Sequence, residues 1–160
     1  MTALYNYSNT QGPYRPIWRS FETCKGPKQG DCGNVEIRNT QNMSDVIFYL
    51  DFPKDCPVTK ARVTAGSVQK NNITKKMLNY ALEKPCQHFV LGPILVDAFN
   101  LSSACKIKKG QYTVHVDMRE KCRMFLGSNF FYGIYTFKVL AFNNVNNFFC
   151  VKTELEAGKL

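Results

Sequence analysis

The sequence predicts an all-β fold, built as a sandwich of two antiparallel sheets. Three observations favour this class: about seven short segments in which apolar and polar residues alternate, turn-forming residues between them, and no strand–helix–strand rhythm of the kind that marks parallel sheets. The chain has 160 residues. That length suits one domain, which would bury roughly 70% of its unfolded surface in a single core.

The strand-like segments follow one another along the chain. Residues 45–52 show the clearest alternation, because every second residue there is a large apolar one. Pro53 ends that strand, since proline cannot donate to a sheet ladder. Residues 25–33 are rich in turn formers, and the asparagines of 143–147 predict a hairpin because asparagine tolerates positive φ. The other predicted strands are residues 16–24, 34–39, 61–68, 111–118, 132–142 and 148–155.

One segment, residues 73–83, has helical spacing. Its apolar residues recur at intervals of three and four. Asn71 or Asn72 could cap a helix here, and Pro85 would end it. We therefore expect one short helix near 73–83.

The two ends of the chain carry weaker patterns. Residues 1–15 are polar and predict a flexible arm or a loosely added first strand. We expect one folded domain over residues 16–156, and at 157–160 a tail or a remnant of an expression vector. The chain opens without the basic and apolar regions of a signal peptide. It is therefore either cytosolic or starts at a mature N-terminus behind an added methionine.

Cysteines and glycosylation sequons favour the secretory alternative. Seven cysteines are more than a cytosolic chain of this size usually carries, and none is spaced as Cys-x-x-Cys. With only two histidines in the chain, a zinc or other metal site is not expected. Together these features predict a secreted glycoprotein, extracellular or in the lysosomal lumen. The four sequons begin at Asn6, Asn42, Asn72 and Asn100.

The formal net charge is +9. Nucleic acid is the usual partner of a basic chain, but there is no arginine-rich run or nucleic-acid-binding motif, so we expect no nucleic-acid partner. The charge instead predicts a solvated basic face with some attraction for an anionic membrane surface. One alternative is a secreted interaction module that acts on a receptor or other partner protein through this basic, glycosylated surface, without an internal ligand.

The second half of the chain carries an ordered set of short motifs. Their order resembles that of the ML (lipid-recognition) superfamily, most of all its ganglioside-activator branch and the related insect secreted and chemosensory proteins. The resemblance covers residues 84–155 well and the rest loosely. Lys106 stands where the family usually has proline. The motifs are Cys86, then Cys105-Lys-Ile-Lys-Lys-Gly-Gln-Tyr, Tyr132-Gly-Ile-Tyr-Thr-Phe-Lys-Val and Phe149-Cys150-Val-Lys.

The resemblance implies an immunoglobulin-like sandwich whose two sheets splay apart around an internal hydrophobic cavity that holds a lipid. It also implies two disulfides, Cys24–Cys150 and Cys86–Cys105. One pair among the remaining cysteines would leave one thiol free. The pairing we favour is Cys32–Cys56, with Cys122 left over.

Aromatic residues also point to a hydrophobic ligand. They make up 13% of the chain, and twelve are phenylalanine. A sandwich has only two inner faces, yet residues 130–142 are apolar on both sides, so some rings must border a cavity, an opening or another surface. The alternative is a phenylalanine-rich core with ordinary exposed apolar area.

We therefore predict a pocket for a lipid or other hydrophobic small molecule, with methionine and aromatic walls. Its lids would be the helix at 73–83 and a loop at 119–131. Cations beside the lids that could meet an anionic headgroup are Lys75, Lys76, Lys121 and Arg123. The predicted ligand-binding residues are Phe48, Leu50, Met77, Leu78, Phe89, Ile94, Phe99, Val114, Phe125, Phe130, Phe131, Tyr135 and Phe137.

Signals of catalysis are weak. The sequence has no Gly-x-Ser-x-Gly element, no glycine-rich phosphate loop and no evident pair of carboxylates. Cys122 with His115 is the one conceivable thiol–imidazole couple, but sequence spacing says nothing about their contact. We therefore expect a binding protein that is not an enzyme and needs no cofactor.

Overall fold

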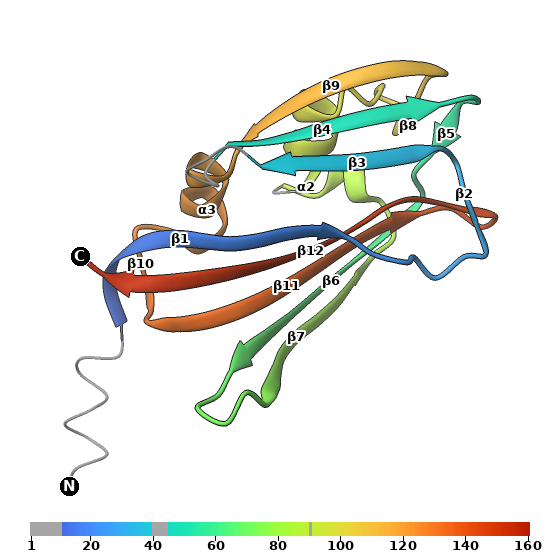
Figure 1. The fold of residues 1–160 in the computed structure, drawn as a ribbon. Helices are drawn as coiled ribbons and strands as arrows, with labels where there is room; N and C mark the ends of the chain where they lie inside the picture. Colours follow the sequence, from blue (N-terminus) through green and yellow to red (C-terminus); the bar gives the residue numbers. More distant parts are fainter. Residues whose placement is uncertain (1–10, 40–44, 90) are drawn as a thin grey trace, which may run out of the picture.

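Antiparallel strands in two layers make up most of the chain (Figure 1). The structure, a computed structural model, describes residues 11–39, 45–89 and 91–160. The predicted all-β class is confirmed. No helix in these described ranges is long and apolar enough to cross a membrane.

The larger layer is a seven-stranded sheet. Its strands in spatial order are β10 (Asn129–Phe131), β1 (Gln11–Thr23), β12 (Asn146–Lys159), β11 (Gly133–Phe142), β6 (Lys60–Val68) and β7 (Thr74–Leu82), with β2 (Gly30–Asp31) beside β12. The smaller layer is a three-stranded sheet of β3 (Asn34–Asn39), β4 (Asp45–Phe52) and β9 (Gly110–Asp117). A short separate pair joins β5 (Cys56–Pro57) to β8 (Lys106–Ile107).

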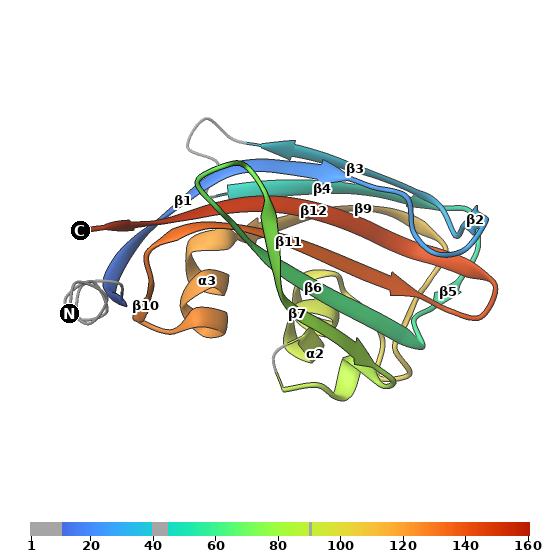
Figure 2. The ribbon, with the colours of Figure 1, turned by 90° about the horizontal axis from the view of Figure 1, so that it is seen from below.

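Short helical segments complete the described chain. They are η1 (Pro85–Gln87), α2 (Leu91–Pro93), η2 (Ile94–Ala98) and α3 (Met118–Leu126). Figure 1 and Figure 2 place α3 near the β10 end of the large sheet, and Figure 1 shows α2 on the side of the small sheet.

The two sheets meet through aromatic side chains. On β4, every second residue from Val46 to Phe52 is buried, as the alternation predicts. Phe52 stacks on Phe148 of β12 with ring centroids 5.2 Å apart. Phe48 meets Phe99, which follows η2, edge to face at 5.0 Å. Stacked and edge-to-face pairs are the favourable geometries for aromatic rings. The Phe52–Phe148 pair therefore joins the two sheets, and the Phe48–Phe99 pair joins the small sheet to the segment after η2.

Three disulfides have the pairing that the sequence analysis favours. They are Cys24–Cys150, Cys32–Cys56 and Cys86–Cys105, and Cys122 is free. The first bridge connects residues 126 apart and joins β12 to the segment that follows β1. In the chain-entropy model, closing so long a loop stabilises the fold by about 4–5 kcal/mol.

The predicted helix at 73–83 is wrong, because this segment forms the edge strand β7. A bulge between Ala65 and Gly66 of β6 explains the misleading pattern. Gly66 pairs with Lys76 and Ala65 with Leu78, which leaves Met77 as the extra residue. A bulge changes same-face spacing from two residues to three. The inward side chains of β7 therefore recur at a spacing that resembles a helix.

The second predicted lid, a loop at 119–131, is also different in the structure. Residues 118–126 form α3, and the chain then enters β10. Asp117 caps the helix, because its side chain accepts hydrogen bonds from the backbone N–H groups of Arg119 and Glu120 at 3.0 and 3.2 Å. Gly127 ends it at φ 79°, a conformation that favours glycine.

The ends of the described chain are more ordered than the sequence suggests. Residues 11–15, predicted as part of an arm, belong to β1. Residues 157–159, predicted as a tail, belong to β12, where Ala157 is buried and pairs with both Pro16 and Gly133. Residues 157–159 are held in the sheet because β12 pairs with β1 on one side, and Ala157 also pairs with β11 on the other.

Two of the four predicted sequons lie in the described ranges. Asn72 is exposed in the turn between β6 and β7, and Asn100 is exposed after η2. Both have positive φ, 63° and 59°. Asn6 and Asn42 lie outside the described residues.

The hairpin predicted at 143–147 is present and joins β11 to β12. Its mechanism differs from the expectation, because no residue of this turn has positive φ. Instead the buried Oδ1 atom of Asn143 accepts hydrogen bonds from the backbone N–H groups of Val145 and Asn146 at 2.9 and 2.8 Å. Its Nδ2 atom donates to the carbonyl oxygen of Pro57 at 2.8 Å.

We predict that Asn143→Ala lowers the free energy of unfolding by about 1–3 kcal/mol, because it removes three hydrogen bonds that the buried side chain makes to the backbone. Urea denaturation followed by circular dichroism measures this. The matched control is Asn144→Ala at the exposed neighbour, which should change stability by less than about 0.5 kcal/mol. Equal effects of the two substitutions would contradict the turn mechanism.

Candidate ligand-binding pocket

An apolar pocket of about 320 Å³ lies between the two sheets. We call it the apolar pocket. Its walls come from β1, β6, β7, β11 and β12 of the large sheet, from β4 and β9 of the small sheet, and from α2, η2 and α3. Almost all of its lining atoms are apolar.

The pocket exists because the small sheet is narrower than the large one. Three strands cannot cover the inner face of a seven-stranded sheet. Strands β6 and β7 run away from the small sheet in Figure 1, and no strand of the small sheet covers them. Phe137 and Val139 of β11 consequently face the apolar pocket and are only partly buried.

The structure brings six of the predicted ligand-binding residues to this pocket. They come from five parts of the chain, which only the fold brings together. These six are Phe48, Leu78, Ile94, Phe99, Phe125 and Phe137.

The other seven predicted residues do not line the apolar pocket. Three are buried in the core: Leu50, Val114 and Tyr135. One is partly buried: Phe130, whose ring packs on Tyr14 and Tyr135 at 6.1 and 5.2 Å. Three are exposed: Met77, Phe89 and Phe131.

Two pocket residues on β1 were missed because of a second bulge. Trp18 pairs with Leu155 and Ser20 with Glu154, so Arg19 is the extra residue. This shift puts Trp18 and Phe21, three residues apart, on the same inner face, and both line the apolar pocket. Simple alternation assigns them to opposite faces.

Helix α3 supplies one side of the pocket and was also missed. Met118, Lys121, Cys122, Phe125 and Leu126 line the apolar pocket from successive turns of this helix. Their spacing of three and four residues is that of one helix face. The available signal was Asp117 followed three residues later by Glu120, a pattern that marks a helix start.

The free thiol lies on this wall. Cys122 is buried, and its Sγ atom is 3.4 Å from the hydroxyl oxygen of Tyr14. The Tyr14 hydroxyl donates to the carbonyl oxygen of Gly127 at 2.8 Å. Since a tyrosine hydroxyl has one proton, the thiol is the donor toward Tyr14. Burial raises the pKa of the Cys122 thiol, and burial together with Cys122 raises the pKa of Tyr14. The thiol is therefore protonated at neutral pH.

Few polar groups line the apolar pocket. Among the described residues, Lys121 is its only charged one, and no carboxylate lies within ion-pair distance of its ammonium group. Thr153 uses its hydroxyl proton on the carbonyl oxygen of Ser20 at 2.8 Å. The indole Nε1 of Trp18 is buried and has no hydrogen-bond acceptor in the described part of the chain. Of the four cations predicted to meet a headgroup, Lys121 alone lines the pocket.

The mouth of the pocket is apolar. Leu78 of β7 and Phe125 of α3 both line the pocket, yet they are 46% and 49% exposed. Residues that are on the wall and half exposed lie at the opening. Phe89 is 84% exposed and stacks on His88 at 4.8 Å, near α2. His88 in turn meets the ring of Tyr80 on β7 at 6.1 Å.

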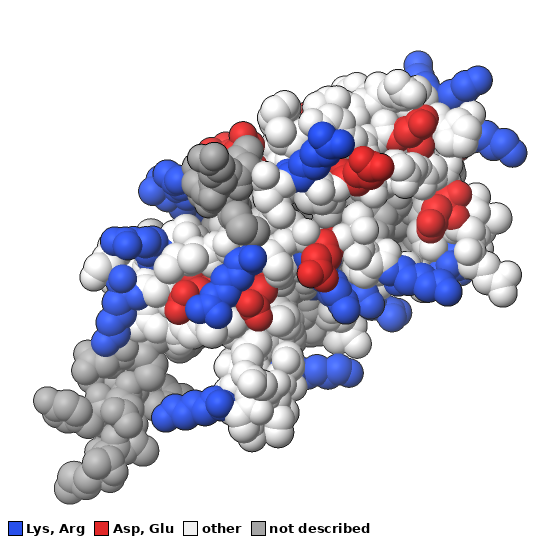
Figure 3. Space-filling model, in the orientation of Figure 1, with Lys and Arg blue, Asp and Glu red and all other residues white. Residues whose placement is uncertain are grey.

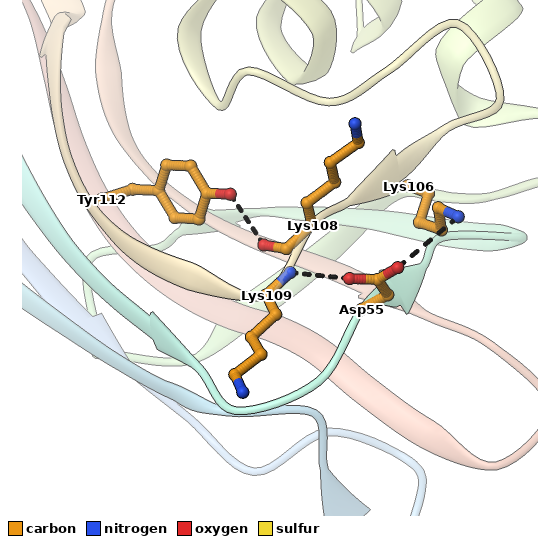
Figure 4. A network of polar contacts seen from close by, with 5 residues as sticks. All are labelled: Asp55, Lys106, Lys108, Lys109 and Tyr112. Atoms are coloured by element: carbon orange, nitrogen blue, oxygen red, sulfur yellow. Dashed lines mark hydrogen bonds and ion pairs between the residues drawn. The ribbon is translucent and has the colours of Figure 1, made fainter.

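The basic residues on the face shown in Figure 3 do not form one continuous patch. Figure 3 shows lysine and arginine side chains distributed over the visible face, with acidic side chains between them. One group of lysines surrounds Asp55, which accepts a hydrogen bond from the backbone N–H of Lys109 at 2.8 Å and lies 3.7 Å from Lys106 Nζ (Figure 4). The hydrogen bond from Lys109 and the charge of Lys106 hold the pKa of Asp55 below its usual value. This network ties two loops together at the surface.

The described residues contain no cluster of histidine, cysteine and acidic side chains that could hold a metal ion. The sequence analysis considered Cys122 and His115 as a thiol–imidazole couple, and the structure gives these two side chains different surroundings. The Cys122 sulfur contacts Tyr14, and His115 is exposed on β9.

Comparison with known proteins returns no relatives: no protein-family model matches the sequence, and no curated protein is significantly similar to it.

We predict that the chain contains one titratable thiol that is shielded by the fold. A thiol reagent should label the native protein slowly and the unfolded, non-reduced protein at one site per chain, because six of the seven cysteines are in disulfides. Mass spectrometry measures the labelling, and Cys122→Ala serves as the blank. Fast labelling of the native protein would contradict the burial of Cys122.

The raised pKa of this thiol also sets a pH dependence. The unfolded chain releases the thiol proton first as pH rises, so the free energy of unfolding should fall above the ordinary thiol pKa of about 8.5. The fall should be smaller in Cys122→Ala.

Proposed function

We propose that this protein is a secreted, non-catalytic binding protein that holds a lipid or other hydrophobic small molecule in the apolar pocket. The observation that carries the proposal is a pocket of about 320 Å³ lined by aromatic and aliphatic side chains from both sheets. Ligand pockets in proteins are typically of this kind, largely apolar with few polar groups.

The driving force would be removal of the ligand's apolar surface from water. Each buried methylene contributes about 0.8 kcal/mol. A chain of about ten methylenes therefore offers about 8 kcal/mol before the costs of association and ordering. No catalytic group is needed for this function.

The proposed secretion rests on covalent features. Three disulfides form and persist in oxidising compartments. The two described sequons, at Asn72 and Asn100, are exposed and thus accessible for glycosylation. We propose an extracellular or lysosomal location on these grounds.

The finer fold assignment belongs to the same proposal. We propose that the two layers form an immunoglobulin-like sandwich that splays open, and that the protein belongs to the ML superfamily. Support comes from the motif order in residues 84–155 and from the Cys24–Cys150 and Cys86–Cys105 bridges that this family resemblance implies.

Binding in the pocket can be tested by filling it. Val139 lines the apolar pocket, whereas its neighbour Lys138 lies on the opposite face of β11. We predict that Val139→Trp lowers the affinity for a neutral fluorescent probe, N-phenylnaphthylamine, by about tenfold or more, because the indole occupies the ligand's volume. Lys138→Trp should leave the affinity unchanged.

Native mass spectrometry of the purified protein gives an independent readout. A co-purifying lipid should be present in the wild type and depleted in Val139→Trp. Thermal unfolding verifies that both variants are folded. A folded wild-type protein that carries no lipid and binds no probe would refute the proposed function.

We further propose that the ligand is exchanged at an anionic membrane surface through the apolar mouth. Leu78 and Phe125 line the pocket and are half exposed, so at the mouth they can contact both the bound ligand and the lipid tails of a membrane. Lys75 and Lys76 are exposed on the same strand as Leu78 and would be attracted to anionic headgroups.

The exposed mouth makes a second functional prediction possible. The double substitution Leu78→Asp and Phe125→Asp should slow transfer of a fluorescent lipid from anionic vesicles by about tenfold, because interfacial binding scales with buried apolar area. The control is Val145→Asp, since Val145 is 72% exposed in the β11–β12 turn and does not line the pocket. Equal slowing by both changes would contradict a role of the mouth.

A further inference from the structure

The polar groups of the apolar pocket carry information about its ligand. Lys121 is the one charged residue of the described wall, and no described carboxylate lies within ion-pair distance of its ammonium group. Trp18 also lines the pocket, but its indole Nε1 atom is fully buried and therefore out of reach of a ligand. The charge that a ligand meets on this wall is that of Lys121.

The described wall has no charged acceptor to match Lys121. It contains no aspartate or glutamate, and the one hydroxyl, on Thr153, already donates to Ser20. A cationic ligand would therefore be repelled by Lys121 without compensation. A pure hydrocarbon would leave the ammonium group without a counterion. A ligand with an anionic, oxygen-bearing headgroup supplies one.

The volume of the pocket limits the rest of the ligand. A cavity of about 150 Å³ accommodates one benzene ring. The apolar pocket, at about 320 Å³, thus has room for about twelve carbon atoms. One acyl chain fits this space, whereas a ligand with two long chains would leave one of them outside.

We propose that the ligand is a single-chain amphiphile with an anionic headgroup, a carboxylate or phosphate ester, that pairs with Lys121. This inference rests on the proposed lipid-binding function and narrows it to one ligand class. Lys121 lies on α3, as does Phe125 at the mouth. Its position lets the headgroup stay near solvent while the chain enters the pocket.

Ligands that differ only in headgroup test the proposal. Lipid is first removed from the protein with a hydrophobic resin, and N-phenylnaphthylamine is then displaced by dodecanoate, dodecyl phosphate, dodecanol or dodecylamine near neutral pH. The two anions should bind about tenfold more tightly than dodecanol, and dodecylamine should bind most weakly. Displacement by both anions identifies the charge as the recognised feature. Preference for one of them identifies the carboxylate or the phosphate.

Two substitutions identify the cation. Lys121→Gln should remove the preference for dodecanoate over dodecanol, and Lys121→Glu should invert the order of dodecanoate and dodecylamine. Lys54→Glu makes the same charge change at an exposed lysine outside the pocket wall and should leave the preference intact. A preference that survives Lys121→Glu would overturn the assignment of Lys121.

The outcomes separate the two proposals. Displacement by all four ligands with equal affinity would overturn the anionic class and leave lipid binding intact. Failure of the probe and of every ligand to bind the folded, lipid-free protein would refute the proposed function itself.

Discussion

The unequal width of the two sheets governs the rest of this structure. The inner face of the large sheet is apolar along β1, β11 and β12, and the small sheet covers only part of it. Aromatic contacts such as Phe52 with Phe148 close the covered part. Over the remaining part, short helices take the place of strands, and their side chains leave a pocket rather than a packed core. The pocket, its mouth and the exposed inner side of β7 all follow from this mismatch.

Regular strands could be predicted from the sequence and bulged ones could not. Alternation identifies β4 to the residue, because its pairing with β3 and β9 is regular. In β7 and β1 one extra residue shifts the alternation, so β7 resembles a helix and Trp18 is assigned to the wrong face. Bulges depend on pairing with a strand far away in the sequence, and no local pattern reports that pairing.

The sequence predicts that an apolar pocket exists, but it identifies only some of the residues that line it. Phe48, Phe99 and Phe137 are large apolar residues in a phenylalanine-rich chain, and they do line it. Phe130 was selected for the same reason, but it packs on two tyrosines instead. The composition indicates that the chain has more aromatic rings than the two inner faces of a sandwich would bury. Which rings border the gap depends on how far the sheets diverge, and that is a property of the whole fold.

The pairing of β1 with β12 has a consequence for biosynthesis. The first described strand and the last one lie side by side, and Cys24 and Cys150 join them across 126 residues. The large sheet therefore cannot be completed until β12 has left the ribosome, and contacts of such long range make folding slow. Until then β1 and β11 expose edges that β12 or a neighbouring chain can occupy. The chain is consequently most prone to aggregation before β12 is inserted between β1 and β11.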